Sequence, residues 1–118
     1  MVQVIIVVRE PGGKGTDYSL EFEVPEVPAI GSYISIRRHL DQRQSSEDMI
    51  VRHVWWQLNH DETHGFSSGA KPGTVADIFV ECDPAIGPHS SDHSRRTLAD
   101  AKARGERVDS FDVSRRRI

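Results

Sequence analysis

The sequence is short of cysteine and of long apolar runs, and each shortage excludes a class of structure. Cys82 is the only cysteine, so the chain cannot form an internal disulfide. The apolar run at residues 4–8 is far shorter than the roughly 20 residues that a membrane-spanning helix needs. It also lacks the basic start of a signal peptide. We therefore expect a cytoplasmic protein without a membrane partner.

Neither sign of charge dominates the chain. The net charge is −3, which gives no general case for binding nucleic acid. The charge is uneven, however: residues 1–83 carry 7 basic and 13 acidic residues, and residues 84–118 carry 8 and 5. The basic tail leaves nucleic-acid binding open as an alternative function, although the acidic body argues against it.

Strand patterns fill the first two thirds of the chain. Residues 18–24 alternate apolar and polar side chains, as in a half-buried strand. Similar or more apolar patterns cover residues 2–8, 32–37, 49–60 and 74–82. The pattern predicts an antiparallel five-stranded sheet or a small SH3-like barrel over residues 1–83. We expect residues 38–48 to be an exposed connection and Pro84 to end the sheet.

The last part of the chain, residues 84–118, differs in kind from the body. It is polar, and good helix formers predict one short helix near residues 94–104. Ser91, Asp92 or Ser94 would cap its start, and Gly105 would stop it. Because its apolar side is thin, this helix needs the body or a partner to hold it.

The central stretch, residues 49–60, contains both tryptophans and organises the predicted sheet. A strand has a period of two, so its side chains divide between two faces. One face carries three apolar side chains that we place in the core: Val54, Trp56 and Leu58. Arg52 would then point inward near the strand start, and a β-bulge at that point would remove the conflict by shifting the phase.

The opposite face of this strand suggests a recognition surface. It carries His53, Trp55 and Gln57, and the neighbouring strand could add Tyr33 and Arg37. An exposed aromatic side chain beside arginine is typical of protein and oligomer interfaces. We therefore predict a non-enzymatic module that binds a protein partner or itself. The alternative is that the C-terminal segment covers Trp55 through Leu98 or Phe111.

Histidine spacing suggests a second, metal-based function. Two pairs of histidines stand four residues apart next to carboxylates: His60 with His64, and His89 with His93. Imidazole and carboxylate suit zinc, so a metal-binding protein or a metal-assisted hydrolase is the alternative prediction. The His-Glu-x-x-His motif of metalloproteases is incomplete, because Glu62 stands one place too late. The Pro-Cys-x-x-Cys half of the zinc deaminase motif is missing.

Other catalytic and cofactor signals are weak. The glycine-rich residues 12–16 lack the phosphate-loop spacing and lead into a strand, so we predict no cofactor. Cys82 lies between Glu81 and Asp83, which should raise the pKa of its thiol instead of activating it. The sequence contains no Gly-x-Ser-x-Gly motif. An enzyme is therefore not the first expectation.

Overall fold

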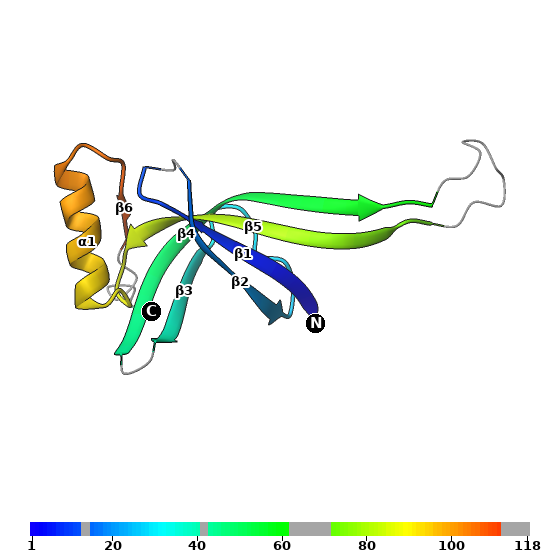
Figure 1. Ribbon diagram of the computed structural model, residues 1–118, viewed down its shortest axis with the longest axis horizontal. Helices are drawn as coiled ribbons and strands as arrows, with labels where there is room; N and C mark the ends of the chain where they lie inside the picture. Colours follow the sequence, from blue (N-terminus) through cyan, green and yellow to red (C-terminus); the bar gives the residue numbers. More distant parts are fainter. Residues whose placement is uncertain (13–14, 41–42, 62–71, 112–118) are drawn as a thin grey trace, which may run out of the picture.

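The computed structural model describes residues 1–12, 15–40, 43–61 and 72–111. The structure is mainly β, and strands make up 57% of it. Figure 1 shows six strands and one helix near the C-terminal end. Their bounds are β1 Val2–Arg9, β2 Thr16–Val24, β3 Tyr33–Leu40, β4 Arg43–Asn59, β5 Thr74–Ile86, α1 Asp92–Ala103 and β6 Asp109–Ser110.

The strands form one mixed sheet in the order β2-β1-β5-β4-β3, with β6 beside β5. β1 and β5 run parallel, as do β5 and β6, whereas the other neighbours are antiparallel. The expected purely antiparallel arrangement is therefore wrong. The connection between β2 and β3 contains Pro25 and Pro28, which have no N–H to continue a ladder. β1 pairs with β5 instead, so it lies between two neighbours.

The mainly β prediction is confirmed, and the sheet curls into a half-barrel that stays open between β2 and β3 (Figure 1). Its inner face holds the main core, to which four strands contribute side chains. These buried residues are Val4, Ile6, Val8, Ile36, Met49, Val51, Ile78, Val80 and Cys82. Alternation along β1 and β5 places them on one face, as the period of two predicts.

β3 and β4 extend into the region that we expected to be an exposed connection. Residues 38–40 end β3, and β4 begins at Arg43, so that prediction is wrong. The segment is polar because its side chains pair with one another: Arg38 forms an ion pair with Glu47 at 2.7 Å. Pro84 also lies inside β5. It falls between the residues that pair with β1 and those that pair with β6. The missing proline N–H therefore costs no backbone hydrogen bond to β1 or β6.

Asp48 anchors the C-terminal segment to the sheet. Its side chain is 1% exposed and accepts hydrogen bonds from the His89 N–H at 2.9 Å and the Ser90 hydroxyl at 3.0 Å. Gly87 lies against the same carboxylate, and a Cβ there would come within 2.5 Å of the Asp48 Oδ2 atom. The turn after β5 is thereby held against β4, and it sets where α1 begins.

The helix confirms the sequence prediction closely. Ser91 caps it by accepting a hydrogen bond from the Ser94 N–H at 3.3 Å, and Gly105 follows it with a φ of +92°. Leu98 and Ala101 pack against Val108 in a second, small core. Beyond the helix, the Phe111 ring stacks on Tyr33 with 4.0 Å between ring centroids.

We predict that Asp48→Ala lowers the free energy of unfolding by about 2–3 kcal/mol, because the buried Ser90 hydroxyl and the partly buried His89 N–H lose their acceptor. Urea unfolding followed by circular dichroism measures this loss. The control is Ser35→Ala, an exposed position on β3, which should change stability by less than about 0.5 kcal/mol. A loss for Asp48→Ala as small as that of the control would show that the carboxylate is not an anchor.

Candidate functional site

A two-stranded arm projects from the half-barrel because β4 and β5 extend beyond the strands next to them (Figure 1). The pairing of β3 with β4 ends at Ile50, and that of β1 with β5 begins at Phe79. Residues 55–59 and 74–79 are therefore called the arm here. The arm is roughly 17 Å long at about 3.4 Å per residue. The radius of gyration is 18.1 Å, against about 13.5 Å for a compact chain of this length.

A β-bulge at Arg52 sets which side chains of the arm face inward. The register shifts between Val51 and His53, as the sequence predicted. Before the bulge, Met49 and Val51 lie in the core. After it, Val54 packs against the core, and Trp56 pairs with the core residue Ile78. Val54, Trp56 and, by alternation, Leu58 therefore share the predicted inner face.

Sharing the inner face does not bury the last two of these side chains. Trp56 is 53% exposed and Leu58 is 65% exposed, so their predicted place in the core is wrong. Val75, which pairs with Leu58, is also exposed. The reason is geometric: the rest of the half-barrel ends before the arm does, and no second layer covers it. The sequence pattern predicted the face correctly but not the burial.

The outer face of the arm carries the predicted aromatic row. Trp55 is 57% exposed and lies opposite the half-buried Phe79. His53 lies next to it, with 6.4 Å between the ring centroids. Gln57 is exposed on the same face. The tryptophans thus give the arm an apolar surface on both sides.

The C-terminal segment does not pack where the alternative prediction placed it. Leu98 belongs to the small core of α1, and Phe111 stacks on Tyr33 of β3. Tyr33 and Arg37 do lie on the strand next to β4, opposite Ile50 and Ser46. Arg37 is therefore roughly 30 Å along the strands from Trp55, and the structure does not bring the two together.

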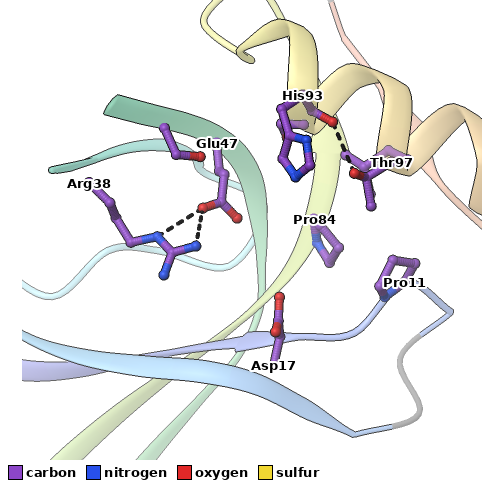
Figure 2. A pocket seen from close by; sticks show the side chains of 10 residues that line it. Pro11, Asp17, Arg38, Glu47, Pro84, His93 and Thr97 are labelled. Atoms are coloured by element: carbon purple, nitrogen blue, oxygen red, sulfur yellow. Dashed lines mark hydrogen bonds and ion pairs between the residues drawn. The ribbon is translucent and has the colours of Figure 1, made fainter. Parts of the chain in front are cut away.

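A small cavity opens between α1, the turn after β1 and the adjoining parts of β3 and β4 (Figure 2). Its volume is about 160 Å³, below the roughly 300 Å³ at which sites for small organic ligands begin. The Arg38 guanidinium donates to Glu47 and lies over the Tyr18 ring at 4.0 Å. Burial and the Glu47 carboxylate raise the pKa of Tyr18. These contacts engage Arg38 and Glu47 with each other and with Tyr18, which indicates a structural role for this pair.

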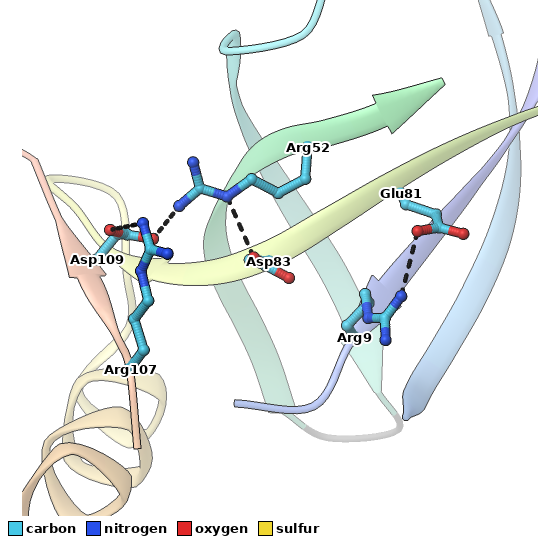
Figure 3. A network of polar contacts seen from close by, with 6 residues as sticks. All are labelled: Arg9, Arg52, Glu81, Asp83, Arg107 and Asp109. Carbon is cyan, nitrogen blue, oxygen red and sulfur yellow. Dashed lines mark hydrogen bonds and ion pairs between the residues drawn. The ribbon is translucent and has the colours of Figure 1, made fainter. Parts of the chain in front are cut away.

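A polar hollow of about 390 Å³ lies on the other side of the sheet (Figure 3). Arg9 contacts Glu81 at 3.2 Å, and Arg52 contacts Asp83 at 3.1 Å. Arg52 also pairs with Asp109, which Arg107 approaches at 3.8 Å. The bulged residue Arg52 thus ties β4 to β5 and β6. Because each arginine faces a carboxylate, the hollow has no excess positive charge with which to hold an anion.

The candidate metal ligands are not gathered in the described part of the chain. No group of three histidine, cysteine or carboxylate side chains lies close enough there to hold an ion. His60 follows β4 at the far end of the arm, whereas His93 lies in α1 and His89 just before it, at the opposite end of the molecule (Figure 1). His64 lies outside the described residues.

No family model matches this chain, and neither a curated protein nor a solved structure matches it. α1, with 12 residues, is too short to cross a bilayer, and no other helix occurs among the described residues. The functional argument therefore depends on the geometry of the chain itself. The arm is the feature that packing within one copy does not explain.

Cys82 should be unreactive in the folded protein. Its side chain is fully buried, and burial, followed by Asp83 and Glu81, raises its pKa from 9.0 to about 12. This shift lowers the thiolate fraction about a thousandfold at neutral pH. At pH 8, iodoacetamide should label Cys82 only when urea unfolds the chain, as mass spectrometry would show. Rapid labelling of the native protein would contradict the burial of this thiol.

Proposed function

We propose that this protein is a non-enzymatic module that associates with other copies of itself, and that the arm is its docking element. The observation that carries this proposal is the exposure of Trp56, Leu58 and Val75 where β4 and β5 pair only with each other, with Trp55 exposed at the base of this ribbon. A two-stranded ribbon is marginal in water. Contiguous exposed apolar side chains mark interaction sites.

Self-association is favoured over an unrelated partner because one chain supplies both halves of an apolar contact. Besides the arm, the body exposes Ile30 at 67% and Tyr33 at 54%. These residues lie next to β4 four to five residues before the arm begins, where Gly31 donates to the Val51 carbonyl at 2.8 Å and Tyr33 pairs with Ile50. The arm of a second copy therefore has an exposed aromatic and aliphatic surface on which to dock.

Among the described residues, no cluster of side chains is arranged for catalysis, which supports a binding function. Glu47 is engaged by Arg38, the thiol of Cys82 is buried, and each arginine of the polar hollow faces a carboxylate. A catalytic site needs titratable groups that are free to exchange protons with a substrate. The proposal places the module in the cytoplasm, where a single reduced cysteine is ordinary.

We expect the variant with Trp56→Ser and Leu58→Ser to associate roughly 100- to 20,000-fold more weakly than the wild type. Each large side chain that an interface buries contributes about 1.5–3 kcal/mol, and tenfold in affinity corresponds to about 1.4 kcal/mol. Sedimentation velocity over a range of concentrations gives the dissociation constants directly. Circular dichroism should be unchanged, because neither side chain is buried in the single copy.

The matched control changes two exposed polar residues that pair at the far end of the arm, Asn59→Ser on β4 and Thr74→Ser on β5. It should associate as the wild type does. A wild type that stays monomeric at every concentration would overturn the proposed function. So would an arm variant that associates as tightly as this control, since the apolar side chains would then play no part.

A further inference from the structure

The half-barrel leaves two edge strands open. In the described part of the chain, β2 pairs only with β1 and β3 pairs only with β4. They are 9 and 8 residues long, which is long for strands without an outer neighbour. The free N–H and C=O groups of such edges form a template on which another strand can pair.

On the outer face of the sheet, β2 carries two carboxylates and β3 carries one guanidinium beside an imidazole. Glu21 and Glu23 are exposed on β2, and Arg37 and His39 are exposed on β3. Within the described residues, none of the four takes part in an ion pair. Directly opposed like charges destabilise a pair of strands, whereas opposite charges stabilise it. Pairing β2 with β3 is therefore favoured over pairing two identical edges.

The inner faces of the two edges are also complementary. Leu20 on β2 is 37% exposed, and the next inward residue along the strand, Phe22, is half-buried. Ile34 on β3 is half-buried as well, although it packs against the core. A strand added at either edge would cover these apolar side chains. The inner contact would be apolar near Leu20 and Ile34, whereas Arg38, farther along the inner face of β3, stays paired with Glu47.

We propose that the acidic edge β2 of one copy pairs antiparallel with the basic edge β3 of a second copy. The inference rests on the proposed function, which makes the partner another copy. β2 runs opposite to β1, whereas β3 runs in the same direction as β1. A second copy rotated about an axis parallel to the strands keeps β2 and β3 antiparallel. Within one copy, Arg38 of β3 already lies over the Tyr18 ring of β2, so a second copy pairs along one edge at a time.

Two charge-reversed variants test this pairing. The first carries Glu21→Arg and Glu23→Arg, and the second carries Arg37→Glu and His39→Glu. Each variant alone should associate at least tenfold more weakly, because its two edges now carry like charge. An equal mixture of the two should associate as tightly as the wild type, because every β2 edge can again meet an oppositely charged β3 edge. Sedimentation velocity measures all three samples, and Asp100→Arg on the exposed side of α1 is the control.

The outcomes separate this inference from the proposed role of the arm. If the charge-reversed variants associate as the wild type does while the arm variant does not, the edge pairing is wrong and the arm proposal stands. If each variant alone is weakened but the mixture does not recover, the two edges do not meet each other. Loss of association in the charge-reversed variants, recovery in the mixture and no effect of the arm variant would support the edge pairing alone.

Discussion

The unequal length of neighbouring strands is the constraint on which the rest of the structure depends. β4 and β5 remain paired after β3 and β1 have stopped, so the sheet narrows from five strands to two. A strand pair without further neighbours has no layer in which to bury side chains. The aromatic side chains of the arm are therefore exposed for a reason of topology, and the same topology makes the arm available to a second copy.

The body of the protein keeps this narrow sheet in place with a few specific contacts. The bulge at Arg52 sets the phase of β4, and the Arg52 side chain joins β5 and β6. At the other end, the buried Asp48 carboxylate holds the turn that leads to α1. These polar contacts lie at both flanks of the apolar core. The arm lies beyond these polar contacts, and at its base Ile78 still belongs to the core.

Local patterns in the sequence predict the elements and the faces, but they do not predict which strands become neighbours. The bulge at Arg52, the helix cap at Ser91 and the inner face of Val54 follow from local chemistry. The parallel pairing of β1 with β5 joins residues more than 70 positions apart, which a period of two cannot reveal. Burial of Trp56 was predicted wrongly for the same reason, because burial depends on those distant neighbours. In the candidate site, the alternating pattern predicted the exposure of Trp55 and His53. The exposure of Leu58 and Val75 depends on which strands are neighbours, which the pattern does not show.

The central claim is that a second copy covers the apolar surface of the arm, and the tryptophans report on this directly. The chain has two tryptophans, and both lie on the arm, so all indole fluorescence comes from the proposed interface. The most direct measurement is the emission maximum and its quenching by acrylamide, followed as the protein is concentrated. The account predicts a shift to shorter wavelength and a loss of quenching as copies associate. Emission that stays typical of solvent-exposed indole while sedimentation shows association would contradict it.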